Sequence, residues 1–155
     1  MPDIHMSNSS TSDPIWKRSF DIEWLNRFSD HCMVSHVGIE FVEIGNNFLR
    51  ARMPVDERTT QPLGLLHGGA SVTLAETLGS TAAHCSVDET LYCVGIEINA
   101  NHIRGATSGY VEGITRPIHR GKMTHVWETR ITDSEGRLLS TSRMTLAVLE
   151  KEQAQ

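Results

Sequence analysis

The chain has 155 residues, a formal net charge of −5 and 39% hydrophobic residues. This length suits one domain with a core of its own and is short of two full domains. Acidic and basic residues are interspersed, which argues against a general nucleic-acid-binding surface. No apolar run approaches the roughly 20 residues that cross a bilayer. We therefore expect neither a nucleic-acid partner nor a membrane partner.

Both ends of the chain are polar. The first residues, MPDIHMSNSSTS, lack the basic start and apolar stretch of a secretory signal peptide. We expect a polar, mobile tail over residues 1–14, a domain over 15–151 and a short tail over 152–155. The cysteines Cys32, Cys85 and Cys93 form an odd set without CxxC spacing. This favours reduced thiols and a cytoplasmic location.

A helix and a hairpin are expected in the first part of the domain. Between residues 15 and 33, apolar side chains recur at near-helical spacing, with the acids Asp21 and Glu23 placed early, where a helix dipole favours them. From residue 36, HVGIEFVEIG and NFLRARMPV alternate apolar and polar residues around the turn-forming residues 45–47. This pattern predicts two antiparallel strands.

A second helix and four strands are expected in the remainder. The helix starts near Gly69, and the strand-like segments that follow are YCVGIEINAN, SGYVEGITRPI, KMTHVWETRITD and GRLLSTSRMTLAVLE. Turn residues at 104–105, 119–121 and 133–136 separate them, and the last three predict a meander. A helix in this position can bury its apolar stripe only against the concave face of the sheet. The predicted fold class is α+β, an antiparallel sheet wrapped around a central helix, with a helix at the N-terminus.

The stretch QPLGLLHGGASVTLAETLGS, residues 61–80, concentrates the unusual residues of the chain. Pro62 and Gly64 oppose helix formation before His67, and Gly68 and Gly69 allow close approach to bare backbone. The first amides of a helix have no partner within it, and the positive end of the dipole lies behind them. The corner at residues 68–69 is therefore suited to stabilising a developing oxyanion.

Glu76 is the only carboxylate of this predicted helix. Leu74 and Leu78 belong to a core-facing stripe, whereas Val72, Glu76 and Ser80 share a different face at i, i+4 spacing. Small neighbouring residues would let a second subunit pack closely against that face. The pattern alone leaves two interpretations of Glu76 open, a solvated surface acid and a functional group.

The segments QPLGLLHGGAS, residues 61–71, and LAETLGS, residues 74–80, together resemble the hotdog-fold thioesterases that cleave aromatic acyl-CoA or acyl-carrier-protein thioesters. The segments MPVDERTTQP and VGIEINANHIR and the later strands are also similar, so the resemblance covers roughly residues 15 to 150. Within the family, the chain resembles the small bacterial enzymes of menaquinone biosynthesis and enterobactin proofreading. The resemblance implies a hotdog fold and a thioesterase for hydroxybenzoyl- or hydroxynaphthoyl-type acyl groups.

The resemblance also implies the site residues and a partner. The backbone N–H of Gly68 polarises the thioester carbonyl, and Glu76 acts as nucleophile or general base. The remaining implied site residues are Gln61, His67, Ser80 and His102, and for His102 a hydrogen-bonded strand histidine is the alternative interpretation. In relatives, one chain supplies the equivalents of residues 61, 67 and 68 and its partner those of 76 and 80. A homodimer that completes the site, often paired into a homotetramer, is therefore implied.

Several further residues were weighed for binding. Basic side chains lie in strand-connecting loops where relatives bind the nucleotide and phosphates of coenzyme A, with a solvated edge as the alternative: Arg104, Arg116, Arg120 and Lys122. Coenzyme A is then part of the substrate, and no cofactor is expected. His84, Cys85 and Cys93 have no zinc-site spacing, so no metal is expected either. Trp16, Trp24 and Trp127 are interpreted as packing residues.

Two other functions compete with hydrolysis. A hotdog hydratase or dehydratase would carry its own paired His and Asp or Glu motif in place of the HGG and AE spacing. A non-catalytic acyl-CoA-binding module of a transcription regulator would need a helix-turn-helix, for which the N-terminal residues leave no room. The sequence leaves open the acyl group, a free or protein-bound pantetheine arm, a covalent or direct-water route at Glu76, and a dimer or tetramer.

Overall fold

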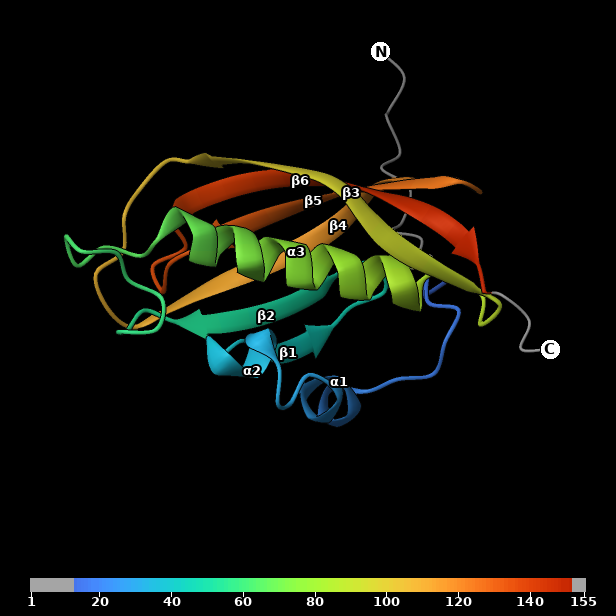
Figure 1. Cartoon of the computed structure of the whole chain (residues 1–155), viewed down its shortest axis with the longest axis horizontal. Helices are drawn as coiled ribbons and strands as arrows, with labels where there is room; N and C mark the ends of the chain where they lie inside the picture. Colours follow the sequence, from blue (N-terminus) through green and yellow to red (C-terminus); the bar gives the residue numbers. More distant parts are fainter. Residues whose placement is uncertain (1–12, 152–155) are drawn as a thin grey trace, which may run out of the picture.

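The computed structural model describes residues 13–151, so residues 1–12 of the tail predicted at 1–14, and the tail predicted at 152–155, lie outside the described residues. The described part contains three helices and six strands (Figure 1). The helices are α1 (Ile22–Phe28), α2 (Met33–His36) and α3 (Gly68–Cys85). The strands are β1 (Glu40–Ile44), β2 (Leu49–Pro54), β3 (Leu91–His102), β4 (Tyr110–Arg120), β5 (Thr124–Thr132) and β6 (Leu138–Glu150). Among these residues, no helix combines the length and apolarity that a membrane crossing requires.

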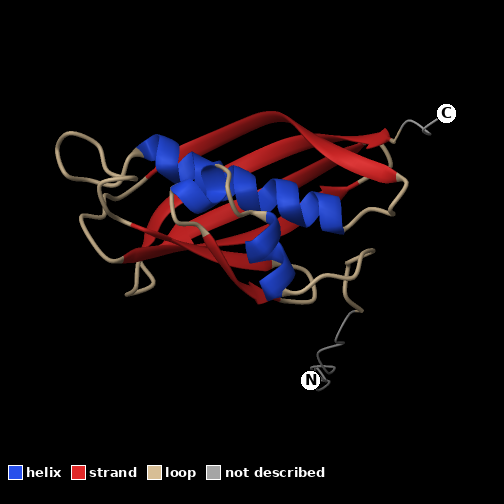
Figure 2. Ribbon diagram, turned by 60° about the horizontal axis from the view of Figure 1, so that its bottom comes forward, coloured by secondary structure: helices blue, strands red, loops and turns tan. Residues whose placement is uncertain are grey.

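All six strands form one antiparallel sheet in the order β1-β2-β4-β5-β6-β3. The predicted meander is confirmed, because β4, β5 and β6 are neighbours in sequence and in the sheet. β3 follows α3 in the chain and pairs with β6 from Leu91 to His102, so β3 is an edge strand over its whole length. Figure 2 shows the sheet curving around α3, as the sequence predicts.

The core lies between α3 and the concave face of the sheet. Leu74, Leu78 and Ala82 are fully buried, which confirms the core-facing stripe predicted for this helix. Close packing requires a glycine opposite them: a Cβ at Gly113 of β4 would lie 2.7 Å from Cδ1 of Leu78. Trp127 of β5 is also fully buried, so this tryptophan is a packing residue as expected. The helix is thereby fixed across the sheet with its other faces toward solvent.

The N-terminal helix is shorter than the spacing over residues 15–33 predicts. Asp21 caps α1 by accepting from the backbone N–H of Trp24 at 2.7 Å, and the helix starts only there. Residues before it are extended, because Ile15 N–H donates to Asn46 and Lys17 N–H donates to Cys85, each at 2.9 Å. Tertiary hydrogen bonds thus satisfy the backbone groups that a longer helix would use.

Candidate active site

The loop before α3 is held in place by backbone hydrogen bonds on both sides. Gly64 has φ +77°, in the left-handed region that favours glycine, and its N–H donates to Gln61 at 2.8 Å. Leu66 N–H donates to Ala106 at 2.7 Å, and His67 N–H donates to Thr59 at 2.8 Å. The Ala106 contact joins the loop to the chain that follows β3, and the Thr59 contact joins it to the segment that follows β2. They fix the point at which α3 begins.

His67 is the N-cap of α3. Its Nδ1 accepts from the N–H of Gly69 at 2.8 Å, and its carbonyl accepts from Ala70 N–H and Ser71 N–H. Among the described residues, the Gly68 N–H is left without a partner at this helix end. The sequence predicts donors at both Gly68 and Gly69, but the Gly69 donor is occupied by the cap. The free donor is the Gly68 amide, with the positive end of the helix dipole behind it.

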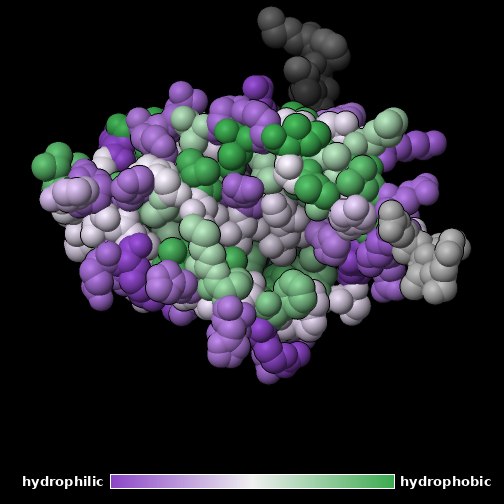
Figure 3. Space-filling view, viewed as in Figure 1, coloured by the Kyte–Doolittle hydropathy of each residue, from purple (hydrophilic) through white to green (hydrophobic). Residues whose placement is uncertain are grey.

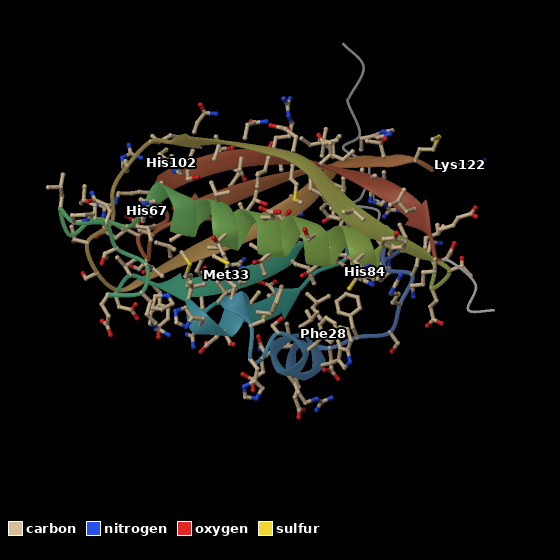
Figure 4. All side chains as sticks on the ribbon, in the orientation of Figure 1. Phe28, Met33, His67, His84, His102 and Lys122 are labelled. Atoms are coloured by element: carbon tan, nitrogen blue, oxygen red, sulfur yellow. The ribbon has the colours of Figure 1, made fainter. Side chains whose placement is uncertain are left out.

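The His102 side chain lies against Gly68. A Cβ built on Gly68 would be 2.9 Å from Nε2 of His102, so only glycine lets the imidazole approach this closely. Figure 4 shows His67 and His102 at the same end of α3. A cavity of about 360 Å³ opens here, and its lining includes Gln61, Gly68, His102 and Arg104. One half of the predicted site is therefore assembled within one chain.

Glu76 and Ser80 lie on the other half of α3. Gly68 and Glu76 are eight residues apart, which corresponds to about 12 Å along a helix axis. Glu76 is exposed, and its Oε1 is 3.6 Å from the position that a Cβ on Gly95 of β3 would take. Ser80 lines a second cavity. Within one chain, Glu76 and the Gly68 amide therefore do not converge on a single thioester carbonyl.

The second cavity, of about 300 Å³, lies between α1 and the last turns of α3. We call it the Ser80 cavity, and its lining residues are Trp24, Leu25, Phe28, Ser29, Ser80, Thr81, His84, Cys85 and Cys93. Trp24 and Phe28 stack with ring centroids 4.9 Å apart and an interplanar angle of 10°. Burial raises the pKa of the Cys85 and Cys93 thiols to about 11, so both stay protonated and act as apolar wall. Sequence reasoning missed this cavity, although Trp24 and Phe28 at i, i+4 spacing were visible.

The predicted basic residues are divided between the two ends of the sheet. Arg104 follows β3 and donates to the carbonyl of Leu138, at the start of β6, at 3.1 Å. Arg120 and Lys122 line a cavity of about 210 Å³ with Lys17 and the buried His125. Met123 beside them accepts from Val148 near the end of β6, and Figure 4 shows Lys122 far from His102. Arg104 is thus not brought together with Arg120 and Lys122 within one chain.

The remaining basic residue, Arg116, is held by neighbouring side chains. It donates to Oδ1 of Asn47 at 2.7 Å, and its guanidinium lies over the ring of Phe48. In residues 13–151, no group of three or more His, Cys, Asp or Glu side chains is placed to hold a metal ion. The described residues thus place an unpaired N–H donor and an imidazole at one cavity, and a carboxylate on the exposed face of α3.

Comparison with known proteins places this arrangement in a family. The model of the thioesterase superfamily matches residues 63–140. The 1,4-dihydroxy-2-naphthoyl-CoA hydrolase of Escherichia coli is 49% identical over 135 residues, covering 87% of this chain and 99% of that protein. The proofreading thioesterase EntH of Cronobacter turicensis is 47% identical over 135 residues, covering 87% and 98%.

A solved structure agrees in fold as well as in sequence. A thioesterase from Haemophilus influenzae superposes with a TM-score of 0.88 at 44% identity and covers 90% of this chain and 97% of its own. The chain belongs to the thioesterase superfamily and has its hotdog fold.

Proposed function

We propose that this protein hydrolyses aryl-CoA thioesters, with the Gly68 amide of one chain and Glu76 of a second copy acting on the same carbonyl. The observation that carries the proposal is the unpaired N–H of Gly68 at the start of α3, in a residue that lies against His102 and lines the same cavity. A donor held in this way stabilises the oxyanion that forms when a thioester is attacked. The relatives named as a naphthoyl-CoA hydrolase and a proofreading thioesterase support the same chemistry.

A second copy supplies the carboxylate that this half-site lacks. The outer edge of β3 is unpaired, and Val94 and Ile96 are exposed on it at 42% and 65%. In Figure 3, hydrophobic residues gather over β3 and the adjoining side of α3. Antiparallel pairing of two β3 strands satisfies the edge and covers these side chains. A twofold axis crossing α3 near residues 72–74 then brings Gly68 of one chain level with residues 76–80 of the other.

The residues then have distinct tasks. The Gly68 N–H donates a hydrogen bond to the carbonyl oxygen as negative charge develops on that oxygen, while Gln61, His67 and His102 surround it. Glu76 of the second copy takes a proton from the attacking water, or attacks the carbonyl itself to form an anhydride that water then opens. Either route breaks the C–S bond and yields a carboxylate and the coenzyme A thiol. Ser80 orients the water or the intermediate.

The Ser80 cavity supports an aromatic acyl group. Its walls are mostly apolar, with two stacked rings on one side, and Ser80 is one turn beyond Glu76. A flat ring entering it gains buried area and stacking at little conformational-entropy cost, whereas a long acyl chain must be ordered. A volume of about 300 Å³ suits one or two rings.

We expect kcat/KM for hydroxybenzoyl- or hydroxynaphthoyl-CoA to exceed that for palmitoyl-CoA by about tenfold, or about 1.4 kcal/mol in the transition state. The measurement is steady-state hydrolysis of both substrate classes by the same preparation, with medium-chain acyl-CoA as an intermediate case. If palmitoyl-CoA were hydrolysed fastest, the thioesterase activity would stand and the proposed preference for aryl groups would be wrong. Absence of hydrolysis of every thioester would reject the proposed function.

The coenzyme A phosphates are assigned to basic residues from both chains. A twofold axis near residues 97–98 of β3 brings Arg104 level with Leu91 of the second copy, and Leu91 lines the same cavity as Arg120 and Lys122. The basic residues separated within one chain would then flank one nucleotide. Arginine and lysine side chains bind phosphate through charge-assisted hydrogen bonds.

Arg104→Ala and Lys122→Ala should each raise KM for benzoyl-CoA by about fivefold to tenfold and leave kcat nearly unchanged, as expected when a charge-assisted hydrogen bond of about 1.5 kcal/mol is lost. Benzoyl-pantetheine, which has no phosphate, is the matched substrate and should show no change in KM. Arg104→Lys keeps the charge and should recover part of the loss. Equal effects on both substrates would contradict phosphate binding.

A further inference from the structure

The far wall of the Ser80 cavity has one polar side chain with an unusual partner. His84 lies on α3, one turn beyond Ser80, and faces the cavity that α1 closes with Phe28. Figure 4 shows His84 and Phe28 close together at the end of α3 opposite His67. Nε2 of His84 is 2.6 Å from Nη1 of Arg18. This contact determines which hydrogen bonds the imidazole can make with a ligand.

Arg18 is held in place by the chain between α3 and β3. Its Nη2 donates to the carbonyl of Leu91 at 2.6 Å and to that of Asp88 at 3.2 Å, and its Nε donates to Val87 at 3.2 Å. Three backbone carbonyls therefore fix the guanidinium beside the histidine. A guanidinium has only donors and does not lose its proton in proteins. In the contact with His84, Arg18 must be the donor and Nε2 the acceptor.

The Arg18 contact fixes the tautomer of His84. Burial lowers the pKa of His84, and the nearby charges of Arg18 and Lys151 lower the pKa further, so the ring is neutral at pH 7. A neutral imidazole that accepts at Nε2 carries its proton on Nδ1. In residues 13–151, Nδ1 has no hydrogen-bond partner. His84 lines a mostly apolar cavity, and its Nδ1–H is the ring donor that remains for a ligand there.

We propose that the Nδ1–H of His84 recognises an oxygen substituent on the acyl ring, at the position remote from the thioester, and so determines specificity within the aryl class. The inference rests on the proposed function, because it requires the acyl group to occupy the Ser80 cavity. Ser80 and His84 are four residues apart, about 6 Å along the helix axis, which is a distance that one ring can span. A para oxygen of a benzoyl group meets this donor, and a methyl group at the same position leaves the donor desolvated and unpaired.

The test compares thioesters of equal shape. For the wild type we expect kcat/KM for 4-hydroxybenzoyl-CoA to exceed that for 4-methylbenzoyl-CoA by at least about tenfold, since a buried donor left unpaired is costly. His84→Phe keeps a ring and removes the donor, so this ratio should fall to about one. Unsubstituted benzoyl-CoA is the reference substrate: dividing each kcat/KM by the value for benzoyl-CoA with the same variant removes any general loss of activity caused by the altered cavity wall. A ratio that His84→Phe leaves unchanged overturns the inference.

If the His84→Phe chain does not fold, a second variant and a direct measurement still test the inference. Arg18→Gln leaves His84 in place and removes the obligate donor, so both tautomers become available and the ratio should fall several-fold. Nitrogen NMR of the wild-type ring should show Nδ1 protonated and Nε2 unprotonated at pH 7, and the reverse overturns the inference. If aryl thioesters are hydrolysed with no preference for a para hydroxyl group, this inference is overturned and the proposed function stands. No hydrolysis of any aryl thioester overturns the proposed function with it.

Discussion

Glu76→Gln should lower kcat for the best aryl-CoA substrate by at least about a hundredfold, the scale of a lost acid–base group. Glutamine has nearly the same shape but is neither a base nor an anionic nucleophile. The fold should be unaffected, because Glu76 is exposed on α3 and makes no ion pair within residues 13–151. Glutamine and glutamate also have similar helix propensities. KM should change little, since the lost interaction is made mainly in the transition state.

A matched control separates catalysis from charge. Glu135→Gln removes an equally exposed carboxylate from the turn between β5 and β6, where its partner is Arg137 at 3.0 Å. Its activity should remain that of the wild type, because exposed ion pairs contribute about 0–1 kcal/mol to stability. Circular dichroism and thermal unfolding should be alike for the wild type and both variants. More than about half of wild-type turnover in Glu76→Gln, on every substrate, would remove Glu76 from the mechanism.

Local patterns were sufficient for the sheet and for the central helix. Period-two alternation predicted β1 and β2, and turn residues separated the strand-like segments that became β3 to β6. The N-terminal segment shows where such patterns are insufficient. Trp16 and Phe20 have helical spacing, but their rings pack edge to face at 5.4 Å and the indole N–H of Trp16 donates to Gly45. A tertiary contact twenty-nine residues away therefore overrides the local preference of this segment.

The candidate site was predicted in its parts rather than in its geometry. The HGG motif and its helix identified the Gly68 amide, but the cap bond that occupies the Gly69 amide depends on the rotamer of His67. The separation of Glu76 from Gly68 follows from helix geometry and could be predicted. That Arg104 and Lys122 lie at opposite ends of β6 depends on which strands pair, and this is a non-local property. The link between Arg18 and His84 spans sixty-six residues and has no local sequence signal.

Mixing two inactive variants tests whether the site is shared between chains. Glu76→Gln inactivates the helix half, and His67→Ala inactivates the loop half, because it removes both the imidazole beside the proposed oxyanion donor and the N-cap hydrogen bond of α3. In a hybrid dimer, one site receives both intact halves and the other receives both altered halves. After complete subunit exchange, hybrids make up about half of the dimers, so activity should recover to about a quarter of the wild-type value. The measurement is turnover before and after exchange at constant total protein.

Two controls make the mixing experiment decisive. Each variant alone, taken through the same exchange procedure, should remain inactive, and differently tagged chains purified together show that hybrids have formed. In a site built within one chain, every site in the hybrid would keep one altered group, so activity would stay at the level of the separate variants. Recovery therefore requires that Glu76 reaches the carbonyl bound at the Gly68 amide of its partner. The unpaired edge of β3 supplies the surface on which the two chains can meet.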